Sequence, residues 1–218
     1  SHYSSDSKGD YKGALETRLK SLSTGIIGEV FSGEYLSDEA LFDSNCIVDL
    51  SRFGSTETKS LIMGLLVLKL TEHRISQRDL KKISNNHPLS HITVLEEAHN
   101  LLKATNTAQS QESSNLIGKS VEMISSSIAE MRTYGEGFII ADQSPSLLDR
   151  SVISNTNTKI IMAMPSKNDR EIAGDSIGLT AAQEKEISRM ETGYAIVYQK
   201  GWQEPVMTKI DYFDKHNP

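Results

Sequence analysis

The sequence predicts an α/β protein with a mainly parallel sheet flanked by helices. Short apolar runs typical of buried strands recur along the chain, and segments with helical periodicity separate them. Strands that alternate with helices form right-handed β-α-β units, which place the strands parallel to one another. Three of the apolar runs also end in acidic or amide side chains, and in such a sheet the carboxyl ends of the strands share one edge.

The first half of the chain is predicted to contain two helices and two strands. Residues 1–10 are rich in Ser, Asp, Lys and Gly and are expected to be disordered or tag-derived. A short helix is expected near Gly13–Ser23 and an apolar strand at Asn45–Leu50. Thr56–Arg74 carries apolar residues on most faces, which predicts a deeply packed helix, and His91–Leu95 is the second strand.

A polar segment and a long helix follow the second strand. Residues 102–115 are predominantly polar and predict a mobile surface loop. The apolar positions of the next segment are three or four residues apart, which places them on one continuous helical stripe. These positions are Ile117, Val121, Ile124, Ile128 and Met131. Gly135 and Gly137 are expected to end this helix.

The remainder of the chain is expected to contain four strands and one helix. The strands are Phe138–Ala141, Thr158–Met164, Tyr194–Tyr198 and Pro205–Ile210. The helix is polar and follows the second of these strands, over residues 167–175. This alternation continues the pattern that predicts parallel β-α-β units.

Polar side chains stand where three of the predicted strands end. Asp49 follows the first strand, Glu96 and Glu97 follow the second, and Asp142 and Gln143 follow the third. One carboxylate can help to hold Mg²⁺, which prefers oxygen ligands, and a second can orient or deprotonate a water molecule. A glutamine can position a γ-phosphate or the nucleophile. A single polar strand end needs no explanation beyond solvent exposure, but three together favour phosphate chemistry.

The order of these motifs resembles the HerA/FtsK superfamily, whose members are hexameric, ring-forming, DNA-pumping P-loop ATPases. The resemblance extends over residues 45–210 and rests on a strand followed by Glu-Glu-Ala-His, a polar loop, a long helix and a second strand. The matching segments are Glu96–His99, Ala129–Gly135, Gly137–Pro145, Leu147–Asp149, Asn155–Thr158 and Asn168–Arg170. The resemblance implies a RecA-like P-loop NTPase core, with residues 11–218 as the C-terminal portion of a HerA-like ATPase domain.

The resemblance also implies roles for individual residues. Glu96 stands at the position of the metal-associated Walker B aspartate, Glu97 at that of the catalytic glutamate, and Gln143 at that of the sensor glutamine. Asp49 is expected to join Glu96 near the bound nucleotide. Family members also supply an arginine to the nucleotide of the neighbouring subunit, although an exposed arginine on a solvated helix is the simpler interpretation of each single one. The candidates are Arg132 and Arg170, followed by Arg150.

Two features depart from the family pattern. The metal position is glutamate instead of aspartate, and the chain contains no G-x-x-x-x-G-K-S/T motif. Gly54–Ser60 ends in Lys-Ser but lacks the second glycine and carries Glu57 where an anion must approach, so it is interpreted as a helix start with Ser55 or Thr56 as the N-cap. The phosphate-binding loop is therefore expected upstream of this chain, which alone should neither bind nor hydrolyse ATP well.

The complete protein implied by the resemblance is an ATP- and Mg²⁺-dependent DNA translocase or helicase. Its expected partners are DNA, further copies of itself in a ring, and a nuclease or restriction partner, with phage defence as one context. Two alternatives remain open. One is a catalytically degenerate interaction module with the ATPase fold, and the other is a metal-dependent hydrolase that uses Glu96, Glu97 and Asp142 without ATP.

Composition restricts the setting of the protein. The 218 residues carry a formal net charge of -6, which argues against broad electrostatic binding to nucleic acid or anionic membranes. The longest apolar run, Leu61–Leu68, is far shorter than the about 20 residues that span a bilayer. Cys46 is the single cysteine and lies in an apolar run, so a buried thiol and a cytoplasmic location are expected.

A basic stripe and a histidine next to the acidic pair are further features of the sequence. Arg74, Arg78, Lys81 and Lys82 form a basic stripe at roughly helical spacing, for which a solvated face is favoured over a contact with the DNA backbone. His99 is expected to pack or to donate a hydrogen bond near the edge that carries the strand ends.

Overall fold

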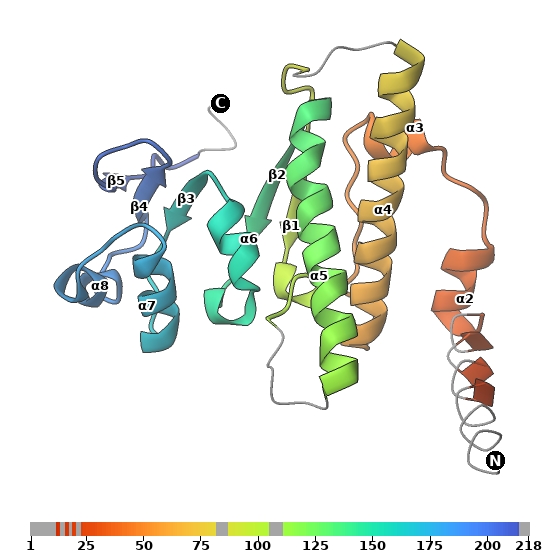
Figure 1. Cartoon of the computed structure of the whole chain (residues 1–218), viewed down its shortest axis with the longest axis horizontal. Helices are drawn as coiled ribbons and strands as arrows, with labels where there is room; N and C mark the ends of the chain where they lie inside the picture. Colours follow the sequence, from red (N-terminus) through yellow and green to blue (C-terminus); the bar gives the residue numbers. More distant parts are fainter. Residues whose placement is uncertain are drawn as a thin grey trace. The chain divides into compact units, whose positions relative to one another are not determined.

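The computed structural model describes residues 23–81, 87–104 and 111–213, together with 12–13, 16–17 and 19–20. The chain divides into two compact units, Ser1–Ser55 and Thr56–Pro218 (Figure 1). The predicted disordered or tag-derived segment 1–10 lies outside the described residues.

The first unit contains the helices α2 (Gly25–Ser32) and α3 (Asp38–Phe42). Its described residues at 12–13, 16–17 and 19–20 are also helical, as predicted for part of this region. The side chain of Ser37 accepts a hydrogen bond from the Ala40 backbone N–H at 3.2 Å and so caps α3.

The predicted strand at Asn45–Leu50 is wrong, because these residues have no regular structure. Ile47 is 94% exposed, and Cys46 is exposed instead of buried. A strand exists only where a neighbouring strand pairs with its backbone, which an apolar run by itself does not ensure. Here the backbone instead turns, and Asp49 Oδ1 accepts a hydrogen bond from the Ser51 N–H at 2.8 Å.

The second unit contains two sheets. β1 (His91–Glu96) and β2 (Glu136–Ala141) pair in parallel, while β3 (Thr158–Ile161), β4 (Tyr194–Gln199) and β5 (Val206–Lys209) form an antiparallel sheet. The prediction of a mainly parallel sheet therefore holds only for β1 and β2 among the described residues. The turn between β4 and β5 is too short for a parallel crossover, which needs a dozen or more residues.

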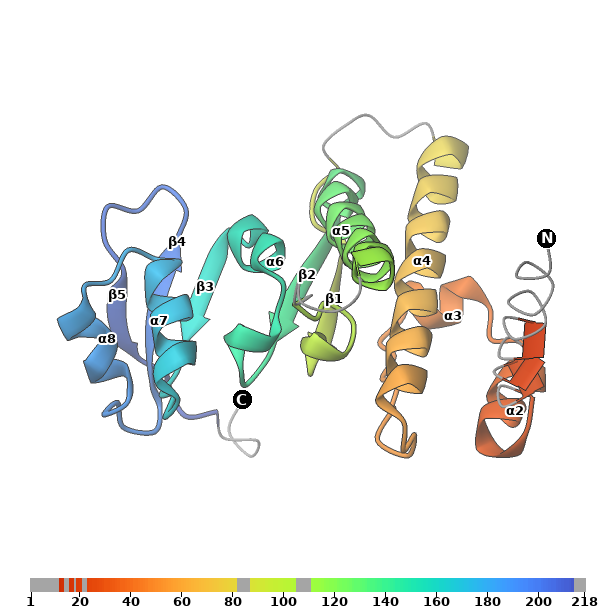
Figure 2. The same cartoon turned by 60° about the horizontal axis from the view of Figure 1, so that its bottom comes forward.

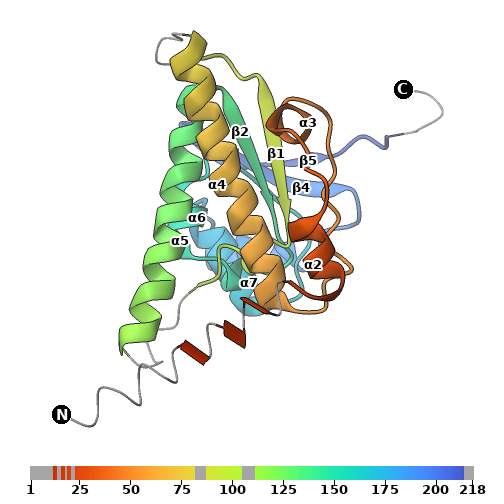
Figure 3. The same cartoon turned by 90° about the vertical axis from the view of Figure 1, so that its right-hand side faces the viewer.

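Two long helices lie side by side along the parallel strands (Figures 2 and 3). The first, α4 (Thr56–Lys81), extends well beyond the predicted Arg74. It buries one stripe, formed by Ile62, Met63, Val67 and Leu70, and leaves Leu61, Leu65 and Leu68 partly exposed. The prediction that this helix packs deeply on most faces is therefore wrong.

The second long helix, α5 (Gln111–Met131), confirms the later part of the predicted stripe, whereas the side chain of Ile117 lies outside the described residues. Val121, Ile124 and Met131 are buried, and Met131 is completely inaccessible to solvent. The helix begins at Gln111, so residues 111–115 of the predicted loop 102–115 are helical. Residues 105–110 of that loop lie outside the described residues. The helix continues into the 3₁₀ turn η2 (Arg132–Tyr134) and ends at Gly135, whose φ of +82° favours glycine.

The antiparallel sheet packs against two further helices. α7 (Lys167–Asp175) was predicted with these bounds, whereas α8 (Ala181–Ile187) was not predicted. The core between these helices and the sheet consists of Ile161, Ala173, Ile177, Ile187 and Ile196. α8 begins with a capping box in which Thr180 and Gln183 exchange hydrogen bonds. β3 ends at Ile161, earlier than the predicted Met164.

Short elements follow the two parallel strands. η1 (Ala98–Asn100) comes after β1, while η3 (Pro145–Leu147) and α6 (Arg150–Asn155) lie between β2 and β3. The Ser146 N–H in η3 donates a hydrogen bond of 3.0 Å to Oδ1 of Asp169 in α7. The segment after β2 is thereby attached to the helix that packs on the antiparallel sheet.

Candidate functional site

The register of β1 and β2 places their carboxyl ends level with each other. Glu96 pairs with Ala141, so Glu97 and Asp142 are the first residues beyond the two strands. This is the edge of a parallel sheet at which α/β proteins bind ligands. The edge carries four of the five polar residues predicted for strand ends.

The turn after β1 is strained at Glu97. Its φ of +49° makes it the one non-glycine residue with a positive φ in the described part of the chain. This conformation costs an L-residue about 1–2 kcal/mol. The backbone N–H and the side-chain Nδ2 of Asn100 both donate to the Glu97 carbonyl oxygen at 2.9 Å, which stabilises the turn into η1.

Glu97 and Gln143 are in direct contact at this edge. The Gln143 Nε2 donates a hydrogen bond of 3.2 Å to Oε1 of Glu97. The Glu97 side chain is 52% exposed, so its carboxylate is accessible to water and to a ligand. Glu96 is exposed as well and lies on the opposite face of β1 from the buried Leu95. The side chains of Glu96 and Glu97 therefore occupy different positions and can have different roles.

Asp142 is buried and bonded from both sides. Its Oδ2 accepts hydrogen bonds from the backbone N–H of His99 at 2.8 Å and from Nδ1 of the same residue at 2.9 Å. Its Oδ1 accepts the Ser144 N–H at 2.9 Å, and the side chain is only 3% exposed. His99 Nδ1 lies 3.7 Å from Oε2 of Glu97. The predicted hydrogen bond of His99 near this edge is confirmed, but its partner Asp142 was not predicted.

This arrangement fits a water-activating site better than a complete metal site. Among the described residues, no group of three or more His, Cys, Asp or Glu side chains is placed to hold a metal ion. Mg²⁺ in phosphate-binding proteins takes only one or two carboxylates and several oxygens from the phosphates and water, and the exposed Glu96 fits that requirement. Both oxygens of Asp142 already accept hydrogen bonds, which gives little support to a metal-dependent hydrolase that uses Asp142.

Asp49 belongs to the first compact unit and not to the unit that carries Glu97. Hydrogen bonds from the backbone and side chain of Ser51 lower the pKa of its carboxyl group from the ordinary 3.8. Its expected place beside the nucleotide stays a prediction.

The three candidate arginines lie in different surroundings. Arg132, in η2, precedes β2 and so lies at the opposite end of this strand from Gln143, about 20 Å away along six residues. The Nη1 of Arg170 donates to the carbonyl of Met164 at 3.1 Å and to that of Pro165. Arg150 is exposed at the start of α6. A role of any of the three toward a neighbouring subunit stays a prediction.

The basic stripe on α4 is not a solvated face. Arg74 is buried, and its Nε contacts Oε2 of the fully buried Glu136 at 2.8 Å. Oε1 of Glu136 accepts hydrogen bonds from Thr93 at 2.7 Å and contacts His91 Nδ1 at 2.8 Å. Arg78 stacks on the ring of Tyr134 at 5.3 Å from its centroid. The side chain of Lys81, and Lys82 altogether, lie outside the described residues.

The segment Gly54–Ser60 is no phosphate-binding loop in this structure. From Thr56 onward it is part of α4, as predicted for a helix start. Ser60 Oγ donates a hydrogen bond to the carbonyl of Asn100, which ties α4 to the turn that carries Glu97.

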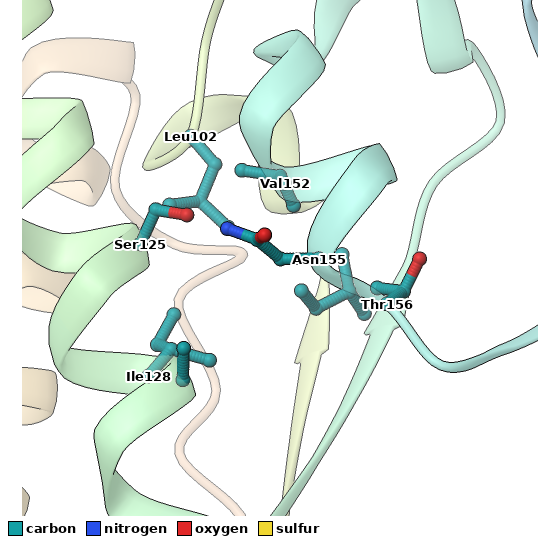
Figure 4. Close-up of a pocket in the computed structure, with 8 residues that line it drawn as sticks. Leu102, Ser125, Ile128, Val152, Asn155 and Thr156 are labelled. Atoms are coloured by element: carbon teal, nitrogen blue, oxygen red, sulfur yellow. The ribbon is translucent and has the colours of Figure 1, made fainter. Parts of the chain in front are cut away.

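A small cavity beside the site is unsuited to a nucleotide. It encloses about 50 Å³ and lies between α5, β2 and α6, lined mainly by apolar groups such as Leu102, Ile128 and Val152 (Figure 4). Drug-sized and cofactor ligands occupy pockets of about 300–1,000 Å³. The cavity is therefore a packing void, and the exposed strand edge is the stronger candidate for the ligand site.

No described helix is both long and apolar enough to cross a membrane.

The fold and the strand-edge residues together are typical of the HerA/FtsK class of ATPases. Comparison with curated proteins finds more particular relatives, each a DNA double-strand break repair helicase HerA. The chain is 29% identical to that of Sulfolobus acidocaldarius over 171 residues, and 25% identical to that of Sulfurisphaera tokodaii over 169 residues. Each match covers 77% of this chain and 32% of the relative, so the chain spans about a third of their length.

The comparisons confirm the resemblance to HerA/FtsK-type ATPases that the motifs indicate. No family model matches the chain. Among solved structures, the chain is similar in fold to B204, the DNA-packaging ATPase of Sulfolobus turreted icosahedral virus. That match has a TM-score of 0.52 and 14% sequence identity, and covers 87% of this chain and 78% of B204. At this identity the likeness concerns the fold alone.

Proposed function

We propose that this chain supplies the water-activating residues of an ATP-hydrolysing, HerA-like DNA translocase or helicase. The observation that carries the proposal is the contact between the exposed Glu97 carboxylate and Gln143 at the shared carboxyl end of β1 and β2. Sequence similarity to proteins named as DNA double-strand break repair helicase HerA supports it independently.

Each residue has a distinct role in this proposal. Glu97 accepts a hydrogen bond from the attacking water and orients it, while Gln143 positions the water or the γ-phosphate. Glu96 takes part in holding Mg²⁺, which neutralises charge on the phosphates when bound. The loop that binds the phosphates is supplied from outside these 218 residues, since they contain no motif of that kind.

The proposed partners follow from the same assignment. DNA is the polymer on which the complete protein acts, and a ring of subunits, most simply a hexamer, places an arginine of one subunit against the nucleotide of the next. The net charge of -6 requires that any DNA contact be local. A nuclease or restriction partner and a role in phage defence are contexts in which such a motor would act.

The experiment that tests this proposal measures ATP turnover by the complete protein that carries this chain. Glu97→Gln keeps the size of the side chain and removes the carboxylate, so kcat should fall by about 100-fold or more while nucleotide affinity is retained. Glu191→Gln, an exposed glutamate before β4, is the matched control and should leave kcat unchanged. A Glu97→Gln variant with wild-type turnover would contradict the proposal.

A second candidate function is an interaction module that keeps the ATPase fold without its chemistry. It is favoured by glutamate in place of aspartate at position 96 and by the missing phosphate-binding motif. Under this alternative the wild-type complete protein hydrolyses no ATP, and Glu97→Gln leaves its partner binding unaltered. Turnover that depends on Glu97 would exclude it.

A further inference from the structure

We propose that Asp142 and His99 together hold the Glu97 carboxylate in the position from which it orients the attacking water. This pair of residues is called the brace below. The inference rests on the proposed function of Glu97 and adds two positioning residues to it. Neither residue is assigned a role by the motif resemblance. The connection between the two is visible only in the folded structure.

The brace is built on a buried anchor. Asp142 is held by the Ser144 N–H on one oxygen and by two donors of His99 on the other. A side chain that is 3% exposed and bonded at both oxygens has a single orientation. Because His99 is held through both its backbone and its ring, the ring is fixed relative to β2 as well as to its own turn.

The braced ring lies against Glu97. Its Nδ1 is 3.7 Å from Oε2 of Glu97, while Gln143 donates to Oε1 from the other side. The carboxylate is thus flanked on both oxygens by side chains that start from the strand ends. A long, half-exposed glutamate otherwise loses rotamer entropy when it is placed for catalysis, and flanking groups reduce that cost.

The strained backbone at Glu97 gives a physical reason for the brace. A positive φ at a glutamate persists only where the surroundings determine it, and such outliers concentrate at functional sites. The hydrogen bonds from Asn100 hold the carbonyl of Glu97, and the bond between Asp142 and the His99 N–H holds the turn that follows. Backbone and side chain of Glu97 are therefore fixed by separate contacts.

Asp142 also sets the tautomer of His99. A carboxylate oxygen accepts hydrogen bonds, so the ring nitrogen that faces it at 2.9 Å, Nδ1, carries a proton. Nitrogen-15 NMR of this chain should show the His99 ring protonated on Nδ1. The Asp142→Asn variant should show a shift of both ring nitrogens toward the values of an ordinary exposed histidine. A His99 ring without a proton on Nδ1 in the wild-type chain would overturn the brace.

The activity test compares three variants of the complete protein. His99→Ala should lower kcat by about 10- to 100-fold with KM for ATP unchanged, because the placement of Glu97 is lost. The variant should stay folded, since the backbone N–H of His99 still donates to Asp142. His99→Asn keeps a donor near the position of Nδ1 and should recover most of the loss. His87→Ala, before the opposite end of β1, is the control and should behave as wild type.

A double substitution separates positioning from a structural role. In the Glu97→Gln background, His99→Ala should cause no further loss in the rate of single-turnover ATP hydrolysis. The reason is that His99 acts through the Glu97 carboxylate, which is already missing. Unchanged kcat in His99→Ala, an equal additional loss in the double variant or no recovery by His99→Asn would each overturn the inference. If Glu97→Gln itself keeps wild-type turnover, the proposed function fails first, and that result is distinct from a failure of the brace.

Discussion

At the scale of single residues, the described part of the chain has a cluster of polar and ionisable side chains at each end of the parallel strand pair. Glu97, His99, Asp142 and Gln143 form the exposed cluster at the carboxyl end. At the amino end, Glu136 lies buried among Arg74, His91 and Thr93. The first cluster is accessible to a ligand, whereas the second is enclosed and joins α4 to both strands, so the second serves stability.

The buried cluster gives a prediction about stability. Glu136→Gln removes the carboxylate that faces the buried Arg74 and should lower the free energy of unfolding by about 3 kcal/mol. Urea denaturation followed by circular dichroism measures the change. Glu186→Gln is the matched control, since Glu186 pairs with Arg189 on the surface at 3.1 Å, and exposed pairs contribute about 0–1 kcal/mol. Equal effects of the two substitutions would refute the structural role of Glu136.

Residue-level prediction from the sequence succeeded where chemistry is tied to a local pattern. The Glu-Glu pair and Asp-Gln pair were located because each follows an apolar strand directly. Arg74 and Glu136 were missed because they are 62 residues apart and nothing local marks them as partners. The link between His99 and Asp142 was missed for the same reason, since it depends on the register of β1 against β2.

At the scale of elements, the hydrophobic spacing identified the long helices and most of the strands, because one buried face imposes a period that is visible in the sequence. It failed at Asn45–Leu50, where an apolar run has no strand partner among the described residues. It also missed α6 and α8, which are too short to establish a period. α7 was expected as a polar helix after the strand at Thr158–Met164, and the structure has it with Ser166 as the N-cap.

The start of α7 gives a prediction about pH. Burial of Asp169 opposes its ionisation, but hydrogen bonds from Ser146 and Ser166 outweigh it and lower the pKa below the ordinary 3.8. The ionised form therefore stabilises the fold above about pH 4, and this contribution is lost as the pH falls through the folded-state pKa.

Urea unfolding at about pH 7 and about pH 3 checks this dependence. Asp169→Asn should be less stable than wild type at neutral pH, and the difference should shrink on acidification. Asp175→Asn, at the other end of α7, provides the control. A difference between Asp169→Asn and wild type that grows toward acid pH would contradict the role of the ionised Asp169.

At the scale of the whole molecule, the chain combines a parallel strand pair, which carries the candidate site, with an antiparallel sheet that packs on α7 and α8. The sequence did not distinguish these two sheets, because helices between strands indicate parallel crossovers only when the chain returns in the same direction. The similarity to HerA helicases extends over 77% of the chain and about a third of their length.

The central claim is that the nucleotide binds where β1 and β2 end. A crystal structure of the complete protein with Mg²⁺ and a non-hydrolysable ATP analogue tests it most directly. We predict a water molecule within about 2.6–3.2 Å of the Glu97 carboxylate, facing the γ-phosphate, with Gln143 on the same side. A nucleotide bound away from Glu97 and Gln143 would contradict the account.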